Sequence, residues 1–124
     1  MNNKQKTVVD FIARGDTPDQ WKMVLVEQGP WSGSVNDHLR RIQDRLYGCI
    51  DAALDGKLAA IFPESHGKNV VLQLDCYNVP RAVVEDFFDR FSAVVFTTDD
   101  YRKALECSEF VRNMKFEINF DNIH

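Results

Sequence analysis

The chain has 124 residues, of which 44% are hydrophobic and 27% are charged, with a formal net charge of −4. This length suits one domain with its own hydrophobic core, and the composition excludes a disordered or fibrous chain. Residues 1–62 hold eight basic and eight acidic side chains, whereas residues 63–124 hold seven and eleven. The acidic excess argues against nucleic-acid binding, which requires basic side chains to neutralise phosphates.

The N-terminal residues and the lengths of the apolar runs indicate where in the cell the protein is located. Residues 1–9 are polar and basic and lack the apolar segment of a secretory signal, and no apolar run approaches the roughly eighteen residues of a membrane span. We therefore expect a cytoplasmic protein without membrane contact. A single α+β domain is expected over residues 1–124, with residues 1–6 disordered.

The N-terminal third predicts an antiparallel β-hairpin followed by a long helix. Residues 7–13 and 21–26 are rich in β-branched and aromatic side chains, and the polar segment between them contains Gly15 and Pro18. In residues 34–62, apolar side chains recur every three or four positions, with Ser34 suited to the N-cap and Gly56 to the C-terminus. Residues 57–62 form either a second short helix or a frayed last turn. These apolar positions are Val35, Leu39, Ile42, Leu46, Ile50, Ala53 and Leu54.

The opposite side of this long helix is charged. It carries Arg40, Arg41 and Arg45 among several aspartates. We interpret this arginine trio as part of a solvated helix face rather than as a basic binding patch.

The second half of the chain predicts two more strands and a second main helix. Residues 70–76 and 110–120 alternate between apolar and polar side chains, as half-buried strands do, and residues 101–107 can form a short helix. The second main helix follows Pro80. Its predicted core stripe consists of Ala82, Val83, Phe87, Phe91 and Val94.

Together these elements predict the order β-β-α-β-α-β. We expect a two-layer α+β sandwich, in which a four-stranded, mostly antiparallel sheet carries the two main helices on one face.

The residues that usually carry out catalysis are scattered. His38 and Cys49 lie about three turns apart on one helix, roughly 16 Å, which is too far for a hydrogen bond. Cys76 with His66 is a conceivable pair across a loop, and His124 is the last residue. The three cysteines fit reduced, mostly buried thiols. We therefore expect neither an enzyme, nor a metal site, nor a cofactor.

Short motifs spread over residues 7–90 form a recognisable set. They are 9–12 (VDFI), 24–27 (VLVE), Pro30, Trp31, Leu39, 42–43 (IQ), 46–47 (LY), 55–58 (DGKL), 62–63 (FP), 67–68 (GK) and Pro80. This set resembles a family of short bacterial proteins of unknown function. The resemblance implies a compact bacterial cytosolic domain and transfers no catalytic residue.

A small acidic domain without a catalytic constellation is suited to bind a basic protein surface. Bacterial immunity proteins that neutralise basic nuclease toxins, including those of contact-dependent growth inhibition systems, are similar in size and charge. We expect an immunity protein that binds a cognate toxin and is itself a monomer or a homodimer. The partner-binding candidates are Glu85, Asp86, Asp89, Asp99, Asp100, Glu106 and Glu109.

An alternative hypothesis belongs to a different functional class. A small cytosolic domain of unknown function could bind a small ligand between the long helix and the sheet. Trp31, Arg45 and Tyr47 are the candidate lining residues of that pocket.

Overall fold

The computed structural model describes residues 9–120, so the predicted disorder of residues 1–6 lies outside the described part of the chain. Two short 3₁₀ turns lie at Pro63–Ser65 and Val95–Thr97. The elements are β1 (Phe11–Arg14), β2 (Gln20–Gln28), α1 (Val35–Leu54), α2 (Lys57–Ile61), β3 (Lys68–Tyr77), α3 (Arg81–Val94), α4 (Asp99–Cys107) and β4 (Val111–Phe120).

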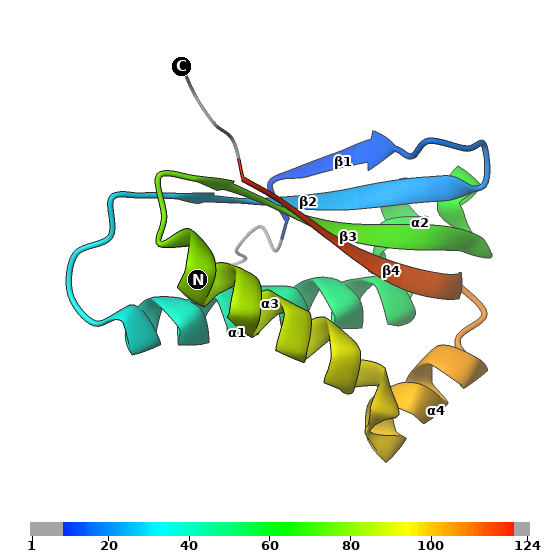
Figure 1. Ribbon diagram of the computed structural model, residues 1–124. Coiled ribbons are helices and arrows are strands. Elements are labelled where there is room, and N and C mark those ends of the chain that lie inside the picture. Colours follow the sequence, from blue (N-terminus) through cyan, green and yellow to red (C-terminus); the bar gives the residue numbers. More distant parts are fainter. Residues whose placement is uncertain (1–8, 121–124) are drawn as a thin grey trace, which may run out of the picture.

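The sheet is mixed, so the prediction of a mostly antiparallel sheet is wrong. Its strand order is β1-β2-β3-β4, and the predicted β1–β2 hairpin is antiparallel, whereas β2–β3 and β3–β4 are parallel. The physical reason is that α1 and α3 each return the chain across the sheet, so the next strand starts at the same end as the previous one (Figure 1). The predicted element order also omits the short helices α2 and α4.

Helices α1 and α3 cover the same face of the sheet (Figure 1). Two successive right-handed crossovers that advance in one direction across a sheet place their helices on one side. The core lies between the two layers, where Leu25, Leu72 and Leu74 of the sheet meet Ile42 and Leu46 of α1, all fully buried. The α+β class is therefore confirmed.

The opposite face of the sheet carries valines and a set of paired polar side chains. Lys22 Nζ lies 3.7 Å from Glu117 Oε1, and the side-chain amides of Gln73 and Asn119 donate to Asp75 Oδ1 at 2.9 and 3.1 Å. Because side chains alternate between the faces of a strand, these residues stand on the side away from the core.

Helix α1 begins and ends as its sequence predicts. The hydroxyl of Ser34 accepts a hydrogen bond from the backbone N–H of Asp37 at 3.3 Å. Gly56 adopts a left-handed conformation, with φ of 92°, between α1 and α2. Residues 57–61 form a separate short helix, which settles the alternative left by the sequence.

Three sides of α1 contact different parts of the molecule. Ile42 and Leu46 face the core, Arg45 reaches the end of β2, and Tyr47 packs against α3.

None of the helices between residues 9 and 120 combines the length and apolar character that a bilayer span needs.

The predicted core stripe of α3 is wrong for Ala82, Val83 and Val94, which are exposed, whereas Phe87 and Phe91 are half-buried and pack against the core. The fully buried side chains of α3 are Val84 and Phe88, whereas Val83 and Val94 are 41% and 53% exposed. Phe87, Val83 and Val94 lie on the side of α3 that faces α1, because they line hollows shared with α1 residues. The apolar stripe chosen from the sequence therefore borders a surface groove.

Candidate functional site

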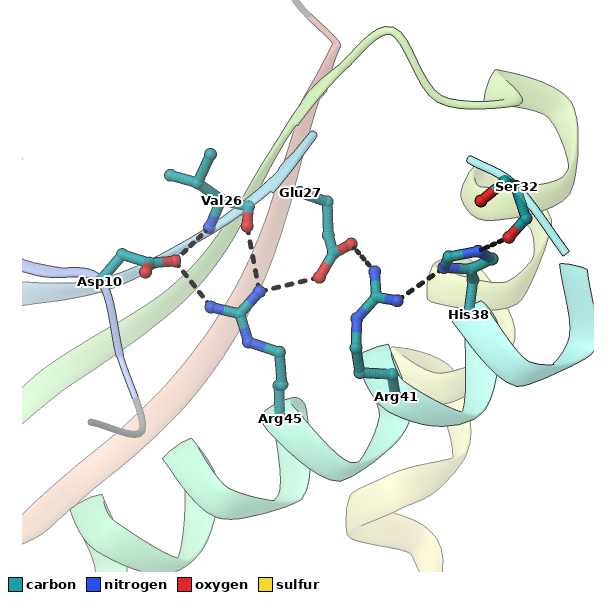
Figure 2. Close-up of polar contacts among 7 residues, drawn as sticks. All are labelled: Asp10, Val26, Glu27, Ser32, His38, Arg41 and Arg45. Atoms are coloured by element: carbon teal, nitrogen blue, oxygen red, sulfur yellow. Dashed lines mark hydrogen bonds and ion pairs between the residues drawn. The ribbon is translucent and has the colours of Figure 1, made fainter. Parts of the chain in front are cut away.

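A buried carboxylate joins the end of β2 to α1. The side chain of Glu27 is 3% exposed. Arg45 Nη1 donates to Glu27 Oε2 at 2.8 Å, and Arg41 Nη2 donates to Glu27 Oε1. The Glu27 cluster is the set Asp10, Glu27, His38, Arg41 and Arg45 (Figure 2).

Arg45 also ties the segment before β1 to this cluster. Its Nη2 donates to Asp10 Oδ2 at 2.7 Å, and its Nη1 donates to the Val26 carbonyl at 3.0 Å. The same Asp10 oxygen accepts from the Val26 N–H at 2.7 Å. Burial lowers the pKa of Arg45, but its hydrogen bonds to Asp10 and Glu27 outweigh burial and raise that pKa. The guanidinium therefore stays charged and holds three segments together.

His38 forms the end of the cluster near the start of α1. Its Nε2 lies 2.7 Å from the Ser32 carbonyl oxygen, and its Nδ1 lies 2.6 Å from Arg41 Nη1 (Figure 2). Because a carbonyl accepts and a guanidinium donates, this network assigns a neutral imidazole with its proton on Nε2. The ring of Trp31 stacks on His38 with centroids 4.5 Å apart and planes at 9°.

The chemistry of the Glu27 cluster is that of a structural clamp. Both guanidiniums already bind carboxylates, and the buried carboxylate is satisfied on both oxygens. The interpretation of the arginine trio as a solvated face is therefore wrong for Arg45, which is half-buried, whereas Arg40 and Arg41 are exposed and Arg41 also binds Glu27.

The proposed ligand-pocket residues do not gather at one place. Arg45 belongs to the Glu27 cluster, and Trp31 lies beside it, with the Arg41 guanidinium carbon 6.0 Å from the centroid of the Trp31 ring. Tyr47 leaves α1 on a different side and packs edge-on against Phe91, with centroids 5.0 Å apart. The structure thus separates Tyr47 from the other two residues.

Tyr47 lines a second feature, an open groove between α1 and α3. Two hollows of about 490 and 310 Å³ share Phe87 and Arg90 as lining residues and so adjoin each other. The Asp86 carboxylate, which lies 3.2 Å from Arg90 Nε, also lines the larger hollow. The α1–α3 groove is defined by Leu39, Gln43, Tyr47, Val83, Phe87 and Val94.

The predicted partner-binding carboxylates of α3 lie on two sides of the helix. Asp86 is at the groove, whereas helical spacing turns Glu85 and Asp89 toward the side of α3 away from α1. Glu85 forms an ion pair with Arg81, at 3.6 Å. Of these three carboxylates, Asp86 is therefore the one that lines the groove.

The remaining candidates lie on α4 and directly after it. Asp99, Asp100 and Glu106 are exposed on α4, and Glu109 is exposed before β4. Arg102 pairs with Asp99 at 3.0 Å and with Glu106 at 3.7 Å. The acidic surface is thus spread over two helices, with part of its charge compensated locally.

The cysteines of the two candidate pairs, Cys49 and Cys76, are both buried. Burial raises the pKa of the Cys49 thiol and of the Cys76 thiol to about 12, so both stay protonated near neutral pH. His38 is held by Ser32 and Arg41. Within residues 9–120, no group of three or more His, Cys, Asp or Glu side chains is placed to hold a metal ion.

The sequence matches one family model over most of its length. That model, a family of unknown function designated DUF6572, matches residues 1–109. The chain belongs to DUF6572. No curated protein and no solved structure matches the chain. The resemblance to a family of unknown function is confirmed.

The DUF6572 match contains both features of the site. It spans β1 through α4, and therefore the whole Glu27 cluster and the whole α1–α3 groove, and it ends before β4. It also extends beyond residue 90, where the resemblance noted from the sequence motifs ends.

Sequence reasoning missed Glu27 and Asp10, and it gave Arg41 a different role. Two signals were present in the sequence: Glu27 interrupts an apolar strand at its end, and His38, Arg41 and Arg45 recur at three- and four-residue steps on one side of α1. An acidic residue at the end of a buried strand, together with basic residues along one side of the following helix, predicts an ion-pair cluster if that helix packs on the strand.

Proposed function

We propose that this chain is a non-catalytic protein-binding domain, a bacterial cytoplasmic immunity protein that binds and neutralises a cognate basic toxin. The observation that carries this proposal is an apolar groove flanked by exposed carboxylates on the helical side of the molecule. Protein interfaces commonly combine an apolar centre with a polar rim, and complementary charge speeds their association.

The charge of the helical side supports a basic partner. The segment from Arg81 to Cys107 carries six carboxylates and four basic side chains. On α1, Arg41 and Arg45 are paired with Glu27, and the other charged side chains of that helix are three exposed aspartates and Arg40. Rim charges of this kind raise association rates and specificity more than affinity.

The small-ligand alternative has weaker support. It requires Trp31, Arg45 and Tyr47 to line one pocket. In the structure, Arg45 binds Glu27, whereas Tyr47 leaves α1 on a different side and packs on Phe91 of α3. Protein binding is therefore the function that the geometry supports best.

The test is co-purification with the product of the gene directly upstream, the position expected for a cognate toxin. We expect a one-to-one complex whose association rate falls with rising salt. Asp86→Lys with Asp100→Lys should slow association by about tenfold or more. Asp16→Lys with Glu64→Lys, an identical charge change at exposed sites near β1 and β3, is the matched control. Absence of a complex, or equal effects of the two double variants, would reject the proposal.

A further inference from the structure

The core explains only part of the apolar character of the α1–α3 groove, because Leu39, Tyr47 and Phe87 pack against it but Val83 and Val94 do not. Val83 and Val94 are two of the most exposed large hydrophobic side chains among the described residues, at 41% and 53%. Between them lies half-buried Phe87, which lines both hollows of the groove. Contiguous apolar surface of this kind, bordered by polar side chains, marks an interaction site.

The dimensions of the groove suit one secondary-structure element. Leu39 to Tyr47 along α1 spans eight residues, and Val83 to Val94 along α3 spans eleven, or about 12 and 16 Å at 1.5 Å per residue. An α-helix of roughly three turns covers that length and presents apolar side chains at i, i+4 and i+7 on one face.

The charges around the groove indicate which charge the bound segment should carry. Asp86 lines the groove, Asp44 is exposed on α1, and Asp99 and Asp100 are exposed on α4 near Thr98, which lines the smaller hollow. Arg90 is a groove-lining cation, and Asp86 pairs with it at 3.2 Å. Asp99 likewise pairs with Arg102 at 3.0 Å. Asp44 and Asp100 remain to favour lysine and arginine side chains on the occupant.

We propose that the α1–α3 groove binds an amphipathic α-helix of the partner protein, with its apolar face against Val83, Phe87 and Val94 and with basic side chains along its flanks. This inference rests on the proposed protein-binding function and adds the structural class and charge of the segment that is bound. The groove then supplies affinity through apolar burial, and the carboxylates orient the helix.

The probe is a fluorescein-labelled helical peptide of about 14 residues with leucines along one face and lysines elsewhere. One control is a scrambled peptide of the same composition, and a second replaces lysine with glutamate. We expect the basic amphipathic peptide to bind at least about tenfold more tightly than either control, as measured by fluorescence anisotropy.

Matched protein variants separate apolar contact from charge. Val83→Glu and Val94→Glu should each weaken binding of the basic amphipathic peptide by about tenfold, even though each adds a negative charge that attracts it. Phe11→Glu adds the same charge at a residue that is 56% exposed on β1 and should leave binding unchanged. Because all three side chains are exposed, thermal unfolding of each variant should match the parent chain.

Each other outcome overturns the inference. No peptide binding, equal binding of the amphipathic and scrambled peptides, or equal effects of Val83→Glu and Phe11→Glu would each reject a helix in the groove. A dimer in solution that Val83→Glu converts to a monomer would identify a second copy of the chain as the occupant. If Asp86→Lys with Asp100→Lys weakens the toxin complex but Val83→Glu does not, the groove inference fails while the proposed function stands. If the upstream protein does not bind at all, the proposed function fails irrespective of peptide binding.

Discussion

Glu27 and Arg45 form an ion pair across the boundary between the helical layer and the sheet. Arg45 Nη1 lies 2.8 Å from Glu27 Oε2, and the exposed fractions of the two side chains are 26% and 3%. Arg41 binds the other oxygen of Glu27. This carboxylate is therefore compensated by two guanidiniums of α1, which tie the end of β2 to that helix.

Replacing Glu27 with glutamine should lower the free energy of unfolding by about 2–4 kcal/mol, because two guanidiniums lose their shared anion. Urea unfolding followed by circular dichroism measures this change. Glu64→Gln is the matched control, since Glu64 is exposed and lies 4.0 Å from the exposed Arg14. That control should change stability by less than about 0.5 kcal/mol. A Glu27→Gln effect no larger than the control would contradict a clamp.

Replacing Gly56 with alanine should destabilise the protein more than replacing Gly33 does. Both glycines have positive φ, of 92° and 84°, so each substitution costs about 1 kcal/mol in backbone strain. At Gly56 the added Cβ would also lie 2.8 Å from ring atoms of Phe110, whereas at Gly33 nothing lies within 4 Å. The loss in unfolding free energy for Gly56→Ala, minus the loss for Gly33→Ala, measures the cost of the contact between the added Cβ and the Phe110 ring. Equal losses would show that the ring moves away freely.

Thiol chemistry should distinguish the three cysteines. Cys107 is exposed, whereas burial raises the pKa of Cys49 and Cys76 to about 12. At about pH 8 the native protein should react rapidly with an aromatic disulfide reagent at one thiol, and the denatured protein at three. Cys107→Ser should remove the rapid reaction. Rapid modification of a second thiol would contradict the burial of Cys49 and Cys76.

The phenol of Tyr101 should resist ionisation at high pH. Burial, together with its hydrogen bond of 2.8 Å to Asp51 Oδ1, raises the pKa of Tyr101. Because the unfolded phenol ionises near pH 10, the neutral form stabilises the fold below that pH and this contribution is lost as pH rises above it. Tyrosinate absorbance of the native protein measures the titration.

Asp51→Asn should move the ionisation of Tyr101 to lower pH, because it removes the negative charge beside the phenol. Asp44→Asn, at an exposed position of the same helix, is the control and should leave the titration unchanged. Identical titrations of the parent chain and Asp51→Asn would contradict a role for the Asp51 charge.

The sequence predicted the elements but not the direction of the strands. Periods of two and of three to four residues located the strands and the main helices, and Ser34 and Gly56 marked the ends of α1. Strand direction depends on where the helices return the chain, which periodicity does not encode. A signal was nevertheless present in the sequence: residues 70–72 are consecutive apolar residues, a run typical of parallel strands, and all three are buried in β3.

The candidate site was predictable in part. The acidic residues of α3 and α4 are evident from the sequence, but α3 carries apolar side chains on two adjacent stripes, so the buried stripe of Val84 and Phe88 could not be distinguished from the groove stripe of Val83 and Phe87. The Glu27 cluster joins residues far apart in the chain, and such pairings depend on tertiary structure rather than on spacing.

The position of β4 sets the time at which the protein can finish folding during synthesis. β4 pairs with β3 at the end of the strand order, and its Phe116 ring contacts Phe88, Phe91 and Phe96. Until residues 111–120 leave the ribosome, β3 is an unpaired edge and the three aromatic rings lack this contact. The nascent chain therefore exposes an aggregation-prone strand edge until β4 joins the sheet.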